Sequence, residues 1–530
     1  MFKKNILLVL FLMGSVLVSA QISFKKIYFA APGRNFIARE IDSSGFDLWY
    51  GSNLYRINQI GDTVFRHGYA TGNGDWFMSR AQQAYDKSTI ITASWGESCS
   101  CCSSNYTRTG VLALVDSQYN IVWSKHYQLS SECGTTSANV YCDKNKNFLM
   151  CGYTINDTTH GIQYPFVIKT DSSGEILWSH KFQTLQNARA DLVVQTLDGN
   201  YLVGLNLDDT IGAVLMKTDT AGQTLWIKRY NLSRSYLFGI LEDADSSLLI
   251  YGQDQYRPYN FNLFISRLTK DGSVVWGKRY EDSTFTTGDW KTEIIHTFDG
   301  NYGVATSSVE NVNRNFLLTK IDVNGEVLWG VSHGDQPHDE IANGLIETKD
   351  HGFLIGGEVW GYFPGYNRSL TAQIIKTDSS GHAGCEEQNK NIVAQPCFLV
   401  DSIIPVIPFI DGATSIVGTV HDSTFGNPFE GAYNKCIFTN VHEPPRIRKE
   451  ATVYPNPNKG EFNIKPDQSP SPILITSFIT VYNSMGRIVL QRPILKEEDK
   501  QIDLTNQGKG IYILKIIEGD KITSSKVVVE

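Results

Sequence analysis

The sequence of 530 residues predicts an all-β fold: a seven-bladed β-propeller, then a small β extension and a C-terminal immunoglobulin-like β-sandwich. The first observation is a repeat of about 50 residues, each copy of which ends in tryptophan. The second is that each copy contains four short runs rich in β-branched and aromatic residues, separated by Asp, Gly and Asn. The third is a change of pattern after Cys385 and another at Ala451. A repeat of this length indicates units that stack because none buries its apolar face alone.

The N-terminal segment, residues 1–20, has the features of a secretory signal peptide. Lys3 and Lys4 precede an apolar run, and the run ends in small residues at Ala20. We therefore expect the mature chain to leave the cytoplasm. No later apolar run reaches the roughly 18 residues of a membrane-spanning helix, so we expect no transmembrane helix after signal cleavage. The 47 basic and 55 acidic residues give a net charge of -8 without long runs of either sign, which argues against nucleic acid as a partner.

Residues 21–386 supply the propeller. Within one unit, the runs DLVVQT, YLVGLN, AVLMKT and TLWIKRY predict four antiparallel strands. An aromatic residue follows each turn of the type D-x-x-G, early in the outermost strand, where it can pack on the neighbouring blade. These expected structural anchors are Phe65, Trp123, Trp178, Trp226, Trp276 and Trp329. The count reaches seven with a degenerate last unit, in which Cys385 takes the place of the tryptophan.

The last unit supplies only three strands. The N-terminal run ISFKKIYF, residues 22–29, carries an aromatic residue, a lysine pair and a tyrosine, much as the outer strand WSKHY does. We expect this run to pair as the missing outer strand and to close the ring. We interpret the basic residues that follow the tryptophans as protection of an exposed sheet edge against strand addition.

Nine cysteines are more typical of an exported protein than of a cytosolic one. The sequence predicts disulfides among the six that lie close together, although it cannot choose the pairing. A metal site or a redox-active vicinal pair is the alternative for the same residues. The six are Cys99, Cys101, Cys102, Cys133, Cys142 and Cys151. Residues 387–450 read as a small β extension followed by a linker, which Cys397 and Cys436 are expected to close.

The tail, residues 451–530, alternates apolar residues with Asn, Gly and Pro turns, as a small antiparallel sandwich does. Its motifs YPNPNKG, YNSMGR and GIYILK resemble the type A C-terminal sorting domain of the type IX secretion system. The resemblance assigns the sorting signal to Tyr454, Pro455, Asn456, Pro457, Gly460, Gly486, Arg487, Gly510, Tyr512, Lys515, Gly519 and Lys526. It implies passage through the periplasm, recognition by the outer-membrane translocon, and processing of the tail by a sortase. The protein would then be secreted or attached to the outer-membrane surface.

The propeller repeat also resembles two known groups. Its KTD-x-x-G-x-x-x-W hairpins are similar to those of secreted Bacteroidota propeller proteins. It also resembles the tryptophan-docking repeat of quinoprotein dehydrogenases, where Asp and Gly are spaced differently from Asp171 and Gly174.

Motifs of catalytic chemistry are missing: the sequence has no G-x-S-x-G elbow, no H-E-x-x-H and no Walker-type loop. A cluster of His and acidic residues between 333 and 340 is interpreted as strand-entry capping, with a metal or general-base site as the alternative. Asp143, Asn145 and Asn147 suggest calcium spacing, but a hairpin turn explains them, and we expect no cofactor. Propeller ligands usually meet the channel end where loops enter the innermost strands. The candidate ligand-binding residues there are Arg80, Arg189, Asp191, Trp290, Lys291, His338 and Asp339.

Two functional readings remain. The favoured one is a noncatalytic binding or adhesion scaffold for an extracellular ligand: a glycan, a protein or a surface polymer. The alternative is an exported enzyme, a quinoprotein-like oxidoreductase or a glycan-active hydrolase, with its site at the channel mouth. Fold alone does not choose between them.

Overall fold

A computed structural model describes the chain at residues 22–28, 36–41, 45–50, 53–71, 75–98, 106–129, 134–156, 162–182, 185, 187–207, 212–232, 235–257, 260–281, 286–287, 291–310, 313–334, 338–363, 366–397, 399–404, 413–417, 420–423, 433–439, 452–465, 477–483, 488–494, 501–518 and 521–530. Contacts within these residues divide the chain into two compact units, with the boundary between residues 437 and 438.

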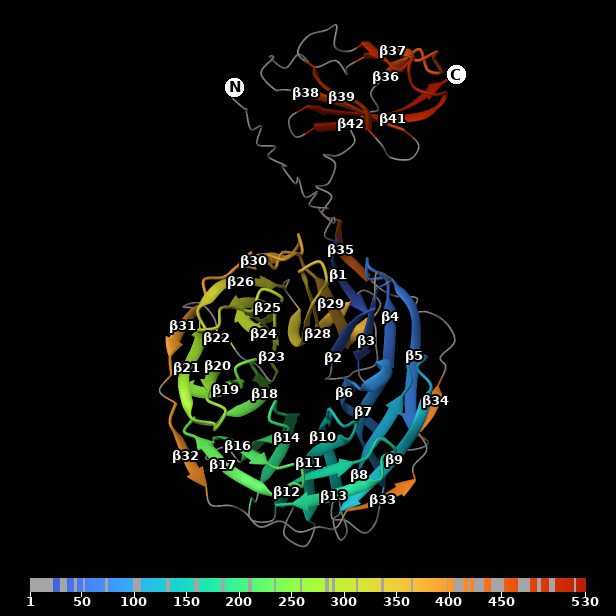
Figure 1. The fold of residues 1–530 in the computed structure, drawn as a ribbon. Coiled ribbons are helices and arrows are strands. Elements are labelled where there is room, and N and C mark those ends of the chain that lie inside the picture. The colour runs from blue at the N-terminus through green and yellow to red at the C-terminus, as the bar shows by residue number, and fades with distance from the viewer. Residues whose placement is uncertain are drawn as a thin grey trace, which may run out of the picture. The chain divides into compact units, whose positions relative to one another are not determined.

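Antiparallel four-stranded sheets follow one another around a ring, as Figure 1 shows. Blade 1 contains β2 (Phe36–Ile41), β3 (Gly45–Tyr50), β4 (Asn53–Ile57) and β5 (Thr63–Thr71). Blade 2 contains β6 (Asp75–Gln83), the 3-10 turn η1 (Tyr85–Lys87), β7 (Thr89–Ser98), β8 (Tyr106–Val115) and β9 (Ile121–Leu129). Blade 3 contains β10 (Gly134–Cys142), β11 (Phe148–Asn156), β12 (Ile162–Thr170) and β13 (Ile176–Lys181). Blade 4 contains β14 (Ala188–Gln195), β15 (Tyr201–Leu207), β16 (Ala213–Thr218) and β17 (Thr224–Tyr230).

The second half of the ring repeats the same order. Blade 5 contains β18 (Tyr236–Glu242), β19 (Leu248–Arg257), β20 (Asn260–Leu268) and β21 (Val274–Glu281). Blade 6 contains β22 (Thr286–Thr287), β23 (Glu293–His296), β24 (Tyr302–Glu310), β25 (Asn313–Ile321) and β26 (Val327–His333). Blade 7 contains β27 (Asp339–Glu347), β28 (Phe353–Phe363), β29 (Tyr366–Lys376) and β1 (Ile22–Tyr28). The predicted seven-bladed propeller is therefore confirmed.

Ring closure uses the N-terminal strand, as the sequence predicts. β1 pairs antiparallel with β29, and Phe24 lies opposite Lys376. The Cys385 assignment, in contrast, is wrong. The chain after Gly381 leaves blade 7, and its next strand, β30 (Glu387–Asn389), pairs with β26 of blade 6. The aromatic anchor of blade 7 is therefore Phe24, whose ring meets the turn at Gly61 of blade 1.

Each blade junction repeats one arrangement of the outer strand against the next turn. A Cβ added to Gly325 would lie 2.7 Å from the Trp276 ring, and one added to Gly174 would lie 2.9 Å from Trp123. Four residues after each of these tryptophans, a tyrosine hydroxyl donates to the carbonyl of the same glycine. Tyr127 reaches the Gly174 oxygen at 2.7 Å, and Tyr280 reaches the Gly325 oxygen at 2.9 Å. At the junctions that follow Trp123, Trp226 and Trp276, the ring and the tyrosine hydroxyl together bind one blade to the next, whereas His333 takes the place of the tyrosine after Trp329 and Phe182 after Trp178.

The apolar core is divided among the blade junctions instead of lying in one mass. Buried clusters occur between successive blades at all seven junctions, for example Leu149 and Val167 of blade 3 against Val203 and Met216 of blade 4. Burial of apolar area stabilises each junction by roughly 25 cal/mol per Å².

The predicted extension forms a strap, residues 387–439, around the outside of the ring (Figure 1). Its strands are β30, β31 (Val393–Pro396), β32 (Asp401–Ile404), β33 (Ala413–Val417), β34 (Val420–Ser423) and β35 (Tyr433–Thr439). They add to blades 6, 5, 4, 2, 1 and 7, so the strap runs against the order of the blades. The expected Cys397–Cys436 link is wrong, because Cys397 is a buried free thiol that packs between blades 4 and 5.

The other described cysteines also correct the sequence analysis. Cys142 and Cys151 are free, so these two do not form the expected disulfides. Cys99, Cys101, Cys102 and Cys133 lie outside the described residues. Cys385 is disulfide-bonded.

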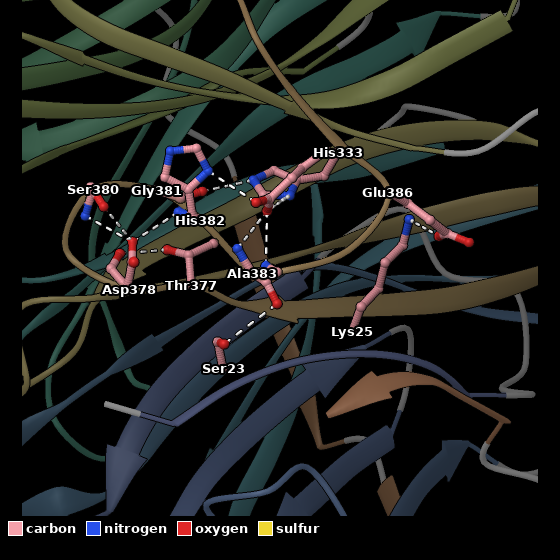
Figure 2. Close-up of polar contacts among 12 residues, drawn as sticks. Ser23, Lys25, His333, Thr377, Asp378, Ser380, Gly381, His382, Ala383 and Glu386 are labelled. Carbon is pink, nitrogen blue, oxygen red and sulfur yellow. Dashed lines mark hydrogen bonds and ion pairs between the residues drawn. The ribbon is translucent and has the colours of Figure 1, made fainter. Parts of the chain in front are cut away.

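Buried charges lie at the seam where β1 closes the ring (Figure 2). The Lys25 ammonium, fully buried, lies 2.9 Å from a Glu386 carboxylate oxygen and 3.5 Å from one of Glu340. The Ser23 hydroxyl donates to the Ala383 carbonyl at 3.4 Å. His333, also fully buried, donates from Nε2 to the Gly381 carbonyl at 3.0 Å, and burial lowers its pKa to about 3.

The tail forms two sheets around its own apolar core. One contains β36 (Thr452–Tyr454), β37 (Glu461–Lys465) and β40 (Gln501–Asp503). The other contains β38 (Ser477–Tyr482), β39 (Ile488–Ile494), β41 (Gly510–Glu518) and β42 (Lys521–Val529). Phe462, Ile479, Ile502 and Leu514 are among the buried side chains of this core.

Candidate ligand site in the central channel

The innermost strands of the seven blades line a central channel. Five of these strands, β6, β10, β14, β18 and β27, shift register against their neighbours at the same place. Such a bulge bends a strand and re-aims the side chain that follows it. The residues just after the shift are Arg80, Asn139, Leu192, Gly239 and Gly344, and all five line the channel cavity. We call this level of the channel the waist.

The cavity has a volume of about 520 Å³. From the waist it follows the second halves of the inner strands, where aliphatic side chains form the wall. These include Ile37, Ala38, Val194, Leu241 and Ile346, which are only partly buried in the blade junctions. Its other end is polar and is formed by Gln82, Gln83, Gln195, Glu242 and His296. The described cavity therefore opens toward the hairpin turns that follow the innermost strands.

An ion pair crosses the channel at the waist. Arg80 on β6 and Glu293 on β23 belong to blades 2 and 6, and their side chains meet at 3.5 Å between Nη2 and Oε1. The negative charge of Glu293 raises the pKa of Arg80. The Arg80 side chain keeps 37% of its surface exposed and that of Glu293 keeps 22%. Both groups therefore retain hydrogen-bonding capacity that faces the cavity, since a guanidinium has five N–H donors.

Tyr251 fills the space beside this pair. A Cβ added to Gly239 would lie 2.0 Å from the Tyr251 hydroxyl oxygen, so only glycine leaves room for the phenol here. Burial raises the pKa of Tyr251, and the negative charge of Glu293 raises it further. The phenol thus stays neutral and contributes a fixed dipole next to the charged pair.

Hydrogen bonds between blades hold the polar end of the cavity. The carboxylate of Glu242 accepts from the backbone N–H of Leu197 at 2.6 Å, and that of Glu347 accepts from Phe298 at 2.6 Å. Burial raises the pKa of both glutamates. His296 Nε2 lies 2.8 Å from an oxygen of Asp243. These groups fix the turns of neighbouring blades, which keeps the rim of the cavity in shape.

Of the sequence-predicted ligand residues that the structure describes, Arg80 alone lines this cavity. Arg189 lies on β14, donates from Nε to Gln163 at 2.8 Å, and covers the ring of Tyr153. Asp191, at the bulge of the same strand, accepts from Asn206 at 2.8 Å, and burial raises its pKa.

The remaining candidates lie at the starts of β23 and β27. Lys291 comes just before β23, and Trp290 lies outside the described residues. Asp339 is the first residue of β27, and its Oδ2 accepts a hydrogen bond from Nη1 of Arg314 in blade 6 at 2.8 Å. The His338 ring packs against Gly361. The acidic and histidine cluster of residues 333–340 is thus distributed over several contacts, because His333 faces Gly381 and Glu340 faces Lys25.

Glu293, Tyr251 and Asn139 were not predicted from the sequence. Which residues of an inner strand face the channel depends on the position of the bulge in that strand. The tryptophan repeat marks the outer strands and does not indicate where these bulges lie. The glycines of the second strands, such as Gly152, offer a usable signal. A Cβ added there would lie 2.0 Å from the Thr136 carbonyl, which marks the bulge on the neighbouring strand.

The calcium-like spacing of Asp143, Asn145 and Asn147 in the sequence raises the question whether the described residues form a side-chain group that holds a metal ion. In the part of the chain that the structure describes, no group of three or more His, Cys, Asp or Glu side chains is arranged to hold a metal ion. The Asp143 carboxylate accepts from the backbone N–H groups of Asn145 and Asn147, both at 2.8 Å, and from the Tyr201 hydroxyl. These bonds engage the residues with calcium-like spacing in a hairpin turn.

Among the described residues, no helix is long and apolar enough to cross a membrane.

The sorting residues of the tail join its first turn to its last strand. The Asn456 amide donates to the Lys526 carbonyl at 2.7 Å and accepts from the Val528 N–H at 2.8 Å. The Tyr512 hydroxyl donates to the Gly508 carbonyl, while Tyr454 is half-exposed. Lys515 lies on β41, and Gly486, Arg487 and Gly519 lie outside the described residues.

The fold defines the chain as a β-propeller protein with a separate sandwich domain at its C-terminal end. Residues 452–530 match the family of secretion system C-terminal sorting domains. This tail supports export as a substrate of the type IX secretion system, to the cell surface or the extracellular space.

Solved structures offer only distant likenesses. Extracellular domains 1-2 of Drosophila Semaphorin 1b are 6% identical, with 68% of this chain and 88% of that chain covered and a TM-score of 0.38. MPT-4, a mannose phosphorylase from Leishmania mexicana solved with a phosphate ion, is 10% identical, with 58% and 84% covered and a TM-score of 0.25. No curated protein matches the sequence.

Proposed function

We propose that the propeller is a noncatalytic binding module that works outside the cell, and that its ligand enters the central channel. One observation carries the proposal: an Arg80–Glu293 pair, still partly exposed, faces a cavity of about 520 Å³. Ligand pockets typically measure about 300–1,000 Å³ and combine an apolar wall with a few polar groups. The waist and wall of this channel have that composition.

The charges at the waist favour binding over glycan hydrolysis. Glycosidases commonly use two carboxyl groups that face the same bond, one as acid and one as base or nucleophile. Here the group that Glu293 faces is the Arg80 guanidinium, not a second carboxyl group. The extracellular ligand would be a small molecule or an accessible end of a glycan, a protein or a surface polymer, because the cavity is too small for a folded chain.

The binding proposal is tested with the purified mature protein. We expect saturable binding of a ligand by calorimetry, loss of that binding in Arg80→Gln, and recovery of the ligand chemically unchanged after long incubation. Turnover of a bound glycan, or a quinone absorbance that accompanies oxidation of an alcohol, would replace the proposal with the enzymatic alternative.

The export route makes a second proposal, which the tail supports. We propose that the outer-membrane translocon recognises residues 451–530 and that a sortase then removes them. A variant that lacks these residues should accumulate in the periplasm, while the full chain reaches the medium or the cell surface. Asn456→Ala is a milder variant, since it removes the two bonds that join the Pro-Asn-Pro turn to β42. Equal export of the truncated chain would contradict the proposal.

A further inference from the structure

We propose that the channel ligand is a small zwitterion of the α-amino-acid class with an aliphatic side chain, or a short peptide of such residues. The inference deepens the proposed function and rests on it. It joins the two features of the cavity that a ligand must satisfy together, which are the opposed charges at the waist and the aliphatic wall beyond them.

The charge pattern argues for a ligand with both signs. Among the described residues, Arg80 and Glu293 make one side-chain contact with each other, at 3.5 Å, longer than a strong charge-assisted hydrogen bond of about 2.7–2.9 Å. The pair is neutral as a whole, so a ligand with a single charge would leave one member facing an unmatched charge. A carboxylate bound to Arg80 and an ammonium bound to Glu293 would satisfy both.

The wall argues for an aliphatic body. Beyond the waist, the partly buried apolar side chains that line the cavity include Ile37, Ala38, Val194, Leu241 and Ile346. These side chains offer no hydrogen bonds, and burial of each ligand methylene against them contributes about 0.8 kcal/mol. A sugar ring, with hydroxyl groups on its edges, would leave those groups without partners along this wall.

The far end sets the length of the ligand. A single amino acid would occupy the waist and the first part of the wall. A short peptide would extend to the polar end, where Gln195 and His296 could meet its second terminus. The size of the cavity, about 520 Å³, accommodates both ligands.

The test uses calorimetric titration of the full mature chain with three probes of matched shape. Leucine carries both charges, 4-methylpentanoate lacks the ammonium, and 3-methylbutylamine lacks the carboxylate. We expect saturable binding of leucine, and binding at least about tenfold weaker for each analogue, because each loses one charged hydrogen bond. Leucyl-leucine tests the longer ligand.

Variants of the two waist residues assign the roles. Glu293→Gln should weaken leucine by at least about tenfold and leave 4-methylpentanoate unchanged or tighter. Arg80→Gln should weaken leucine and leave 3-methylbutylamine unchanged or tighter. Arg189→Gln is the matched control, because this arginine lies outside the cavity and should not alter binding. The double variant Arg80→Glu/Glu293→Arg keeps one group of each charge and serves if a single variant fails to fold. It should bind leucine in preference to both single-charge analogues and should unfold at a temperature close to that of the unaltered protein.

The outcomes separate the two proposals. If neither leucine nor leucyl-leucine binds up to millimolar concentration while another ligand binds in an Arg80-dependent way, the ligand class is wrong and the binding module stands. If leucine binds equally well to Arg80→Gln and Glu293→Gln, the site is wrong. If leucine binds and is chemically converted, the ligand class stands and the noncatalytic function fails.

Discussion

Two glycines of blade 6 give a matched test of how the blades are joined. Gly325 and Gly300 both have positive φ angles, +74° and +81°. A Cβ on Gly325 would lie 2.7 Å from the Trp276 ring of blade 5, whereas a Cβ on Gly300 would meet nothing within 4 Å. Alanine at Gly300 therefore costs only the left-handed backbone term, about 1–2 kcal/mol. Alanine at Gly325 adds an overpacking cost of about 1–3 kcal/mol, for a total of about 2–5 kcal/mol.

The assay is thermal and urea unfolding of the purified propeller, followed by tryptophan fluorescence. For a unit of roughly 400 residues the entropy of unfolding is about 0.8 kcal/mol/K, so each kcal/mol shifts the Tm by about 1 °C. We expect Gly300→Ala to lower the Tm by about 1–2 °C and Gly325→Ala by about 2–6 °C. The double variant Gly325→Ala/Trp276→Ala lacks the ring that the new methyl group would overlap. It should therefore lose less stability than the sum of the losses in the two single variants. Equal shifts for the two alanine variants would show that the tryptophan does not pack on the turn.

Three further perturbations test the closure seam and the strap. His333 has an ordinary pKa of 6.5 when unfolded but about 3 when folded, so the unfolded chain binds more protons between these values and stability falls as the pH decreases through this window. In His333→Gln, the urea concentration at the unfolding midpoint should therefore depend less on pH between about 6.5 and 4.5. An unchanged dependence would exclude this histidine as the cause of the loss of stability at low pH. Lys25→Met should destabilise the ring by about 3–5 kcal/mol because it removes the buried ammonium that lies 3.5 Å from Glu340 and 2.9 Å from Glu386, and Lys25→Met/Glu340→Gln should recover part of that loss in the same assay. A chain that ends at residue 386 should self-associate in light scattering, since it uncovers the edges of β1, β5, β9, β17, β21 and β26, whereas one that ends at residue 450 should stay monomeric.

The repeat predicted the number of blades and the closing strand because both depend on local patterns. The alternation around Trp226 and the turn at Gly222 specify an outer hairpin with no knowledge of the rest of the chain. The run around Phe24 and Tyr28 copies that pattern, so its role could be recognised although its partners are over 300 residues away. The hydroxyl of Tyr28 bonds to the Gly61 carbonyl just as Tyr230 bonds to Gly272.

The strap could not be predicted in the same way. Its strands are three to seven residues long and contain few alternating apolar residues, because they add to a rim that is exposed on the other side. Ile403, for example, is 78% exposed. The residues that read as edge protection have another use as well: Lys125 pairs with Glu175 and Lys278 with Glu326 of the following blade. The edges of these two outer strands, β9 and β21, are covered by strap strands β33 and β31.

The channel site was predicted only in part for a similar reason. Arg80 could be chosen because it is a charged residue on an innermost strand. Its partner Glu293 comes from the opposite side of the ring, and a contact across a channel leaves no periodic trace in the sequence.

The order of assembly follows from the two strands that flank the seam. β1 lies between β29 and β35, so residues near 25, 375 and 436 must meet in one sheet. Closing loops of this size costs chain entropy that local pairing cannot offset, and contacts so distant in sequence form late and slowly. The blades can therefore form one after another, but the ring stays open until β29 has been made and pairs with β1, and the outer edge of β1 stays bare until β35 has been made. A chain interrupted before residue 366 would be an open arc, and one interrupted between residues 376 and 433 would be a closed ring whose β1 edge is bare, which gives quality control a physical feature to recognise.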